Sequence, residues 1–161
     1  MAIEKVRAYF ETLGRADDIL EFPVSSATVA LAAQALGTEE KRIAKTMSFK
    51  HGDGCILVVA AGDARVDNKK FRAAFGMKAS MLHVEDVERI VGHDVGGVCP
   101  FAVNDGVNVY LDESLKRFAT VFPACGSANS AIELTIPELE QYSGYKEWVD
   151  VCKGWQPEEA E

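Results

Sequence analysis

A lysine inside an alternating, largely apolar segment is the first candidate for chemistry in this sequence. Residues 41–50 are KRIAKTMSFK, and in an extended strand Lys45 would share one face with Ile43 and Met47. Burying an unpaired ammonium costs several kcal/mol, so a lysine on an apolar face needs a reason. Either its charge faces a pocket, where it can bind an anion or a developing oxyanion, or its long side chain reaches water from a sheet edge. The segment alone leaves both interpretations open.

A glycine- and proline-containing loop is the second candidate. Residues 96–101 are GGVCPF, and backbone N–H groups at Gly96 and Gly97 could approach a bound oxygen because no Cβ obstructs them. Cys99 is a candidate nucleophile, but it has neither a nucleophile signature nor an identifiable histidine partner. The loop can equally be a turn whose glycines serve only the backbone. No G-x-S-x-G, phosphate-loop or H-E-x-x-H motif is present.

The cysteines and histidines predict neither a metal site nor a disulfide framework. The four cysteines contain no C-x-x-C pair, and the three histidines have no H-x-x-x-H spacing. We therefore expect four buried thiols, and no cofactor or metal.

The charge is unevenly distributed along the chain. The net charge is −8, yet residues 41–78 hold 9 basic and 3 acidic side chains, whereas residues 79–161 hold 5 basic and 15 acidic ones. Local charge steers a polyanion more than the total does, so this segment permits an RNA-facing side. A solvated, lysine-rich helix face is the simpler alternative.

The length of 161 residues and the 48% hydrophobic content predict one domain over residues 1–161. No apolar run reaches the about 18 residues of a membrane span, and the N-terminus lacks a signal-peptide core. We therefore expect a cytoplasmic protein with no membrane partner and a frayed acidic tail at 156–161.

The spacing of apolar residues and of helix caps predicts helices over 2–13 and 27–36, a third helix that begins after Asp67, and two more over 84–92 and 136–144. Ser25 or Ser26 would cap the second helix and Asp67 the third, and proline would occupy the first position of the last one. Gly14, Gly37 and Gly92 would end the first, second and fourth helices.

Strands are expected at 43–50 and 55–61, joined as a hairpin by HGDG, with the second strand central because it is apolar throughout. Weaker strand signals lie at 17–24, 79–83, 107–112, 118–126 and 131–135. Together the elements predict a single compact α/β domain with a mixed sheet.

The ordered set of segments resembles one family. The segments ATVALAAQALGTEEKRIAKTMSFK, CILVVAAGDARVDNKKF, VGGVCPFAV, VYLDESL and PACGSANSAIELT are similar to the YbaK/prolyl-tRNA-synthetase-associated (ProX-type) editing domains, over about residues 20–145. The most specific parts are the lysine of AKT and the G-x-x-P-F loop. The resemblance implies a barrel-like mixed sheet with helices packed outside it.

Members of this family hydrolyse the ester that joins a wrong amino acid to tRNA, as synthetase insertions or as free-standing trans-editing proteins. The resemblance implies the free-standing form, with Lys45 as the catalytic residue, because a lysine can hold a phosphate or polarise an ester carbonyl. The implied substrate-binding residues are Gly96, Gly97, Val98, Cys99, Pro100, Phe101, Gly126, Ser127 and Asn129. The GSANS segment differs from versions that select alanine or cysteine, which leaves the amino acid open.

The implied partner is the acceptor end of a mischarged tRNA, with a synthetase as a further partner and no DNA. The cations expected to contact tRNA phosphates are Lys41, Arg42, Lys50, Lys69, Lys70 and Arg72. No residue is an obvious general base, so the attacking water would be held by backbone groups and a tRNA hydroxyl. A non-catalytic relative that binds tRNA or a synthetase is the alternative, and a small-molecule esterase is disfavoured because no triad is present.

Overall fold

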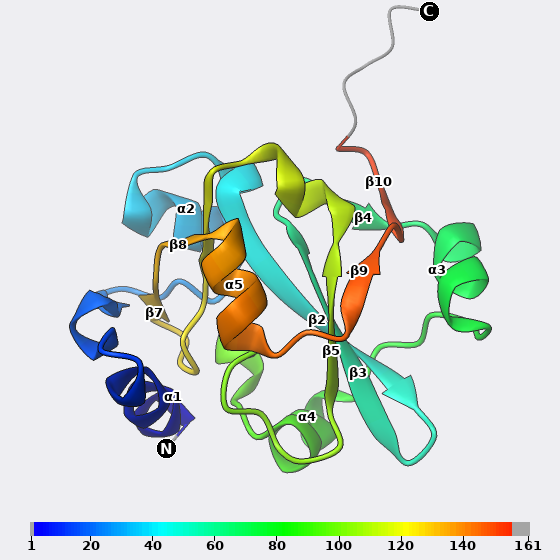
Figure 1. Cartoon of the computed structure of the whole chain (residues 1–161), viewed down its shortest axis with the longest axis horizontal. Coiled ribbons are helices and arrows are strands. Elements are labelled where there is room, and N and C mark those ends of the chain that lie inside the picture. The colour runs from blue at the N-terminus through cyan, green and yellow to red at the C-terminus, as the bar shows by residue number, and fades with distance from the viewer. Residues whose placement is uncertain (1, 156–161) are drawn as a thin grey trace, which may run out of the picture.

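The fold is built on a mixed sheet with the strand order β8-β6-β2-β3-β5-β9, in a computed structural model that describes residues 2–155. Its strands are β2 (Ile43–His51), β3 (Gly54–Ala61), β5 (Asn108–Asp112), β6 (Thr120–Pro123), β8 (Leu134–Thr135) and β9 (Glu147–Val149). β2 and β3 form the expected antiparallel hairpin, while β6 runs parallel to β2, and β5 runs parallel to β3 and β9. The sheet curls into a half-barrel, so the predicted fold class is confirmed (Figure 1).

Two short strand pairs flank this sheet. β1 (Leu20–Glu21) pairs with β7 (Ser130–Ala131), and β4 (Arg65–Val66) pairs with β10 (Cys152–Lys153), both antiparallel. The second pair brings the last described strand back to the turn that follows β3.

Helices cover both faces of the sheet (Figure 1). They are α1 (Ala2–Thr12), α2 (Val29–Leu36), α3 (Asn68–Phe75), α4 (Val84–Val91) and α5 (Ile136–Ser143), with short 3-10 turns η1 (Ala16–Asp18), η2 (Glu40–Arg42), η3 (Val95–Gly97) and η4 (Glu113–Arg117). None of the helices within 2–155 is long and apolar enough to cross a membrane.

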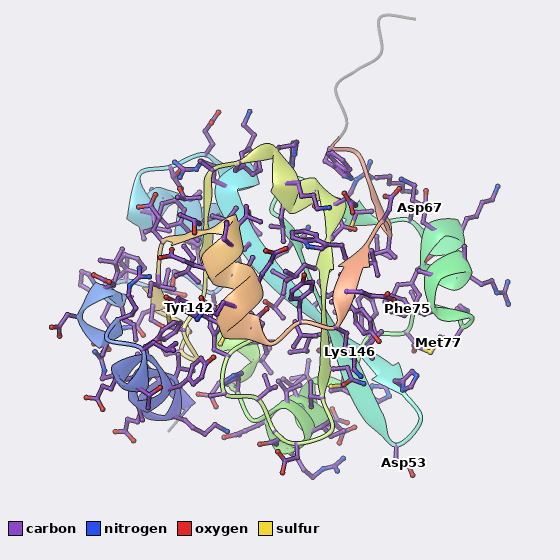
Figure 2. The ribbon with its side chains drawn as sticks, viewed as in Figure 1. Asp53, Asp67, Phe75, Met77, Tyr142 and Lys146 are labelled. Atoms are coloured by element: carbon purple, nitrogen blue, oxygen red, sulfur yellow. The ribbon has the colours of Figure 1, made fainter. Side chains whose placement is uncertain are left out.

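The core divides into clusters on either side of β3, whose residues 55–61 are all buried, as expected for a central strand. One cluster joins the sheet to α1, α4 and α5, where Phe10 packs edge-on against Tyr142 with ring centroids 5.7 Å apart. Figure 2 labels Tyr142 on α5. A second cluster joins the sheet to α3 through Phe71 and the partly buried Phe75 (Figure 2). A third, smaller cluster joins α2 to β2 and β6 through Ala32, Ala33, Ile43 and Phe122. All four cysteines are buried and free, as expected.

The predicted helix ends are largely confirmed. Asp67 caps α3 by accepting from the backbone N–H groups of Lys69 and Lys70, and Gly37 and Gly92 end α2 and α4 with positive φ. A left-handed backbone of this kind favours glycine because it has no Cβ.

Other local predictions were wrong. The cap of α2 is Thr28, not Ser25 or Ser26, because the Thr28 side chain accepts from the Leu31 N–H group while the Ser26 hydroxyl donates to the Ala128 carbonyl. α5 begins at Ile136, so Pro137 occupies its second position rather than its first.

Several strand predictions also need correction. Of the expected strand over 17–24, only Leu20–Glu21 is a strand, because Asp17 and Asp18 lie in the 3-10 turn η1. Residues 79–83 form only an isolated bridge between Phe49 and Met81. The expected strand over 131–135 is divided between β7 and β8, which pair with different partners. β4, β9 and β10 were not expected at all. The predicted frayed tail at 156–161 lies outside the described residues.

Candidate functional site

A pocket of about 110 Å³ opens at the point where β6 leaves β2. The two parallel strands share only two residue pairs, Ile43 with Phe122 and Ala44 with Pro123. The pocket is lined by these parts of β2 and β6, by the start of α2, by the η3 loop and by β7: Ser26, Ala27, Thr28, Val29, Ala32, Ile43, Ala44, Lys45, Thr46, Val95, Gly96, Val98, Phe122, Ala124, Ser130 and Ala131.

Lys45 is the one titratable side chain among the described residues that line the pocket. It lies opposite Ala60 of β3, is half-buried, and donates a hydrogen bond from Nζ to the Ala64 carbonyl oxygen. Burial lowers the pKa of the Lys45 ammonium, and the nearby Cys152 and Asp63 side chains oppose that shift only in part. The cation therefore sits at a pocket wall with a neutral oxygen as its hydrogen-bond partner, although its catalytic role stays a prediction.

The turn that carries Ala64 is fixed from outside the pocket. The Asp63 carboxylate accepts two hydrogen bonds from Arg117, at 2.6 and 3.0 Å. The Arg117 guanidinium lies over the rings of Phe118 and Trp155, at 4.7 and 5.1 Å from their centroids. A bidentate pair of this kind fixes geometry as well as charge, so the partner oxygen of Lys45 is held in place.

The glycines of the η3 loop pack against a second loop. A Cβ atom on Gly97 would lie 2.3 Å from the backbone nitrogen of Ser127, and one on Gly96 would lie 3.0 Å from the Ala128 side chain. The Gly97 N–H group donates to the Asp94 carbonyl at 2.9 Å, so it is already occupied rather than free for a bound oxygen. Of this pair, only Gly96 lines the pocket.

The rest of the GGVCPF segment divides between pocket and core. Val98 lines the pocket, whereas Cys99, Pro100 and Phe101 are buried outside the lining, and Phe101 packs edge-on against Phe10 at 5.0 Å. Burial raises the pKa of the Cys99 thiol to about 12, which makes a nucleophilic role unfavourable.

His93 lies beside this thiol but does not activate it. Its Nε2 is 2.7 Å from the Phe101 carbonyl oxygen and 3.5 Å from the Cys99 sulfur. Burial lowers the pKa of the His93 imidazole, so the pair is a neutral imidazole and a neutral thiol inside the core.

The segment 126–129 supports the wall rather than forming it. Gly126 has a φ of +96°, which requires glycine. The Ser127 hydroxyl donates to Ser130 Oγ at 2.7 Å, and the Asn129 amide donates to the Phe22 carbonyl at 2.9 Å. None of Gly126, Ser127 and Asn129 lines the pocket, whereas Ser130 does.

The six predicted tRNA-contacting cations do not form one patch. Lys41 and Arg42 lie in η2, and the Arg42 guanidinium is 5.0 Å from the centre of the pocket-lining Phe122 ring. Lys50 lies five residues beyond Lys45, about 17 Å along an extended strand, and contacts His83 at 3.0 Å.

The other three cations, Lys69, Lys70 and Arg72, belong to α3, which lies on the opposite side of the molecule from α2 (Figure 1). Lys70 donates to Asp150 at 3.1 Å and to the Cys152 carbonyl at 3.0 Å. Only the η2 cations are therefore adjacent to the pocket, and contact of any of the six with tRNA stays a prediction.

Sequence reasoning missed the hydroxyl side chains of the pocket, which are Ser26, Thr28, Thr46 and Ser130. Thr46 follows Lys45 directly, and Ser26 and Thr28 lie in the SSAT segment that precedes α2. The spacing of these four residues in the sequence does not indicate that they line one pocket. Strand pairing and the turn at β7 bring them together in the fold.

Comparison with known proteins gives a consistent match. Residues 24–142 match the sequence profile of the family described as "Aminoacyl-tRNA editing domain". The Bacillus subtilis (strain 168) protein YwhH, itself uncharacterized, is 55% identical over 157 residues, which cover 97% of this chain and 100% of that one. The Enterococcus faecalis protein EbsC, named as a candidate Cys-tRNA(Pro)/Cys-tRNA(Cys) deacylase, is 32% identical over 104 residues, or 63% of each chain.

The fold has a solved counterpart. A crystal structure of a candidate trans-editing enzyme for prolyl-tRNA synthetase superimposes with a TM-score of 0.84 at 30% identity, covering 95% of this chain and 98% of that one. Sequence and structure thus match over the same region, which contains the Lys45 pocket.

Proposed function

The chain belongs to the aminoacyl-tRNA editing domain family, and from that membership we propose that it is a trans-editing deacylase, which hydrolyses the ester of a tRNA mischarged with a small amino acid. The observation that carries the proposal is the position of Lys45. It is the one cation among the described lining residues of a small pocket, within the region that matches the family.

The reaction requires little beyond positioning, because an aminoacyl ester is already activated. Water adds to the ester carbonyl carbon, the bond from that carbon to the ribose oxygen breaks, and the water's proton passes to the ribose oxygen. The free amino acid and an uncharged tRNA leave. An ammonium beside the carbonyl or the terminal phosphate stabilises the negative charge that develops.

The proton route follows from the composition of the pocket. No carboxylate or imidazole is present among the described lining residues, so no protein side chain other than Lys45 can titrate there. We propose that the vicinal ribose hydroxyl of the tRNA itself relays the proton while the pocket excludes bulk water. Holding water and ester together supplies much of the rate in such a reaction.

The size of the pocket supports a small aminoacyl group. The pocket volume is about 110 Å³, and alanine, glycine, serine and threonine make up much of the lining, which favours a small occupant. Synthetases discriminate poorly among small side chains, since one methylene contributes only about 1–3 kcal/mol. The partner we propose is therefore a synthetase for a small amino acid, with both proteins acting in the cytoplasm.

The test is amino acid release from a panel of tRNAs mischarged with alanine, serine, threonine or cysteine. We compare wild type with Lys45→Ala and with the exposed-lysine control Lys78→Ala. We expect release of one or two amino acids, a loss of at least about 100-fold in Lys45→Ala, and no change in Lys78→Ala.

Two other results would contradict different parts of the proposal. An unaltered rate in a folded Lys45→Ala variant would remove Lys45 from the mechanism. No release from any tRNA by wild type would favour the non-catalytic binding role.

A further inference from the structure

The polar side chains of the pocket, apart from Lys45, are all hydroxyls. Ser26, Thr28, Thr46 and Ser130 are set among alanine, valine, isoleucine, phenylalanine and glycine in the described lining. A hydroxyl can donate one hydrogen bond and accept another at the same time, so each of these four side chains can have both a donor and an acceptor as partners.

Three of these hydroxyls have partners within the protein. Thr28 Oγ1 accepts from the Leu31 N–H group at 3.1 Å, and the Ser26 hydroxyl donates to the Ala128 carbonyl at 3.3 Å. Ser130 Oγ accepts from the Ser127 hydroxyl at 2.7 Å. These bonds cap α2 and hold together the loops around it, so their presence has a structural reason.

Thr46 differs from the other three. Its Oγ1 is buried and has no hydrogen-bond partner within the part of the chain that the structure describes. Leaving a buried hydroxyl unpaired is unfavourable, and valine would fill the same space without that cost. The residue paired with Thr46 on β3 is in fact a valine, Val59. A threonine in this position therefore indicates a polar partner that arrives with the ligand.

The geometry of β2 places Lys45 and Thr46 on opposite faces of the sheet, so they would contact different parts of a ligand. Successive side chains of a strand point to opposite faces, so Thr46 shares a face with Ala44, and Lys45 stands on the other face. Ala44 belongs to the core cluster against which the pocket residues Val98 and Ala124 pack. The pocket therefore reaches both faces of the sheet at the edge of β2. The Lys45 cation lies on one face and the Thr46 hydroxyl on the other.

We infer that Thr46 determines specificity by hydrogen-bonding a hydroxyl on the side chain of the bound aminoacyl group, so that the pocket selects a seryl or threonyl ester over an alanyl one. The inference rests on the proposed deacylase function. The ester and phosphate belong near Lys45, and a ligand ammonium would be repelled by that cation. The ribose hydroxyl and the attacking water adjoin the ester, so we place them on the Lys45 face as well and the aminoacyl side chain on the Thr46 face. An aminoacyl group without a side-chain hydroxyl then leaves Oγ1 unpaired.

The test compares Thr46→Val, which keeps the shape and removes the hydroxyl, with Thr46→Ser, which keeps the hydroxyl. Single-turnover release is measured from one tRNA charged in turn with serine, threonine or alanine. Wild type should release serine or threonine at least about tenfold faster than alanine. Thr46→Val should lower that ratio by about tenfold, and Thr46→Ser should retain it.

Equal losses on seryl and alanyl esters in Thr46→Val would overturn the inference, because the hydroxyl would then act on the common part of the substrate. A wild-type preference for alanine would overturn it while leaving the deacylase proposal intact.

A second measurement does not depend on turnover. Binding of 3′-serylamido-3′-deoxyadenosine and of its alanyl counterpart is compared by calorimetry for wild type and Thr46→Val. Tighter binding of the seryl amide by wild type, lost in Thr46→Val, would support the inference even if no ester is hydrolysed. Equal binding of the two amides by wild type would overturn it.

Discussion

At the scale of single residues, the molecule keeps one ammonium half-buried at the pocket wall. The cation donates to the Ala64 carbonyl, a neutral acceptor that offsets only part of the cost of burial. The folded protein thus disfavours the protonated form of Lys45 relative to the unfolded chain. This difference in protonation between the folded and unfolded states predicts the direction in which the free energy of unfolding changes with pH.

We predict a pH-dependent difference between wild type and Lys45→Met. Because burial lowers the pKa of Lys45 below its ordinary 10.5, the unfolded state holds more protons than the folded state over the interval between the two values. The free energy of unfolding of wild type should therefore rise with pH through that interval, whereas Lys45→Met lacks this contribution. Urea unfolding at pH 7 and pH 10 measures it.

The difference between the two proteins should shift in favour of wild type at pH 10. A constant difference across these pH values would mean that the ammonium is as well accommodated in the fold as in water. A shift in the opposite direction would mean that the neighbouring carboxylates outweigh burial.

At the scale of elements, the pocket depends on close contact between two loops. Gly97 of η3 lies against the backbone of residues 126–127, and the 126–129 loop is tied in turn to Phe22 through Asn129. The glycine is thus needed for packing between these segments, and its contact with a ligand stays a prediction.

We predict that Gly97→Ala separates these loops. Its Cβ would meet backbone atoms at 2.3–2.6 Å, which cannot move aside as a flexible side chain can. We expect a destabilisation of about 1–3 kcal/mol and loss of deacylation, measured by urea unfolding and by amino acid release. Gly54→Ala is the matched control, because its nearest heavy atom is 3.9 Å away.

The control should stay within about 0.5 kcal/mol of wild type. A stable and active Gly97→Ala protein would show that the two loops separate without consequence for the pocket.

Much of the element pattern could be predicted from local signals. Caps and turns such as Asp67, Gly37 and the HGDG link act over a few residues, so the sequence marks them directly. The division of 131–135 between two sheets could not be predicted, because it depends on which strands lie nearby. The same holds for Phe101, whose position in the core is decided by Phe10, 91 residues earlier in the chain.

The candidate site was predictable to a similar extent. Lys45, Gly96 and Val98 were expected in the pocket and line it. The unpaired state of Thr46 was not predictable, because satisfaction of a hydroxyl depends on every atom around it.

At the scale of the whole molecule, the cations near the pocket are few and the net charge is −8. Lys41 and Arg42 adjoin the pocket, while the three α3 cations lie on the far side (Figure 1). The proposed binding of tRNA through so few cations would therefore involve a small number of phosphate contacts.

We predict unequal effects for two exposed lysines. Lys41→Glu should lower kcat/KM on mischarged tRNA several-fold and reduce the salt dependence of binding by about one ion, whereas Lys69→Glu on α3 should do neither. Titration of kcat/KM against salt concentration for both variants measures this. A larger effect at Lys69 would place the acceptor stem along α3 instead.

Residues in and next to strand β10 complete the surroundings of Lys45 late in protein synthesis. Its Cys152 contributes to the environment of Lys45, the preceding Val151 N–H group donates to Asp112, and Trp155 covers Arg117, which holds Asp63. The ribosome makes the chain from its N-terminus, so the lysine emerges more than a hundred residues before these neighbours. A nascent chain can thus assemble the hairpin early, yet the surroundings of Lys45 are completed only when residues 151–155 leave the exit tunnel. The proposed editing activity would thus be withheld from unfinished chains.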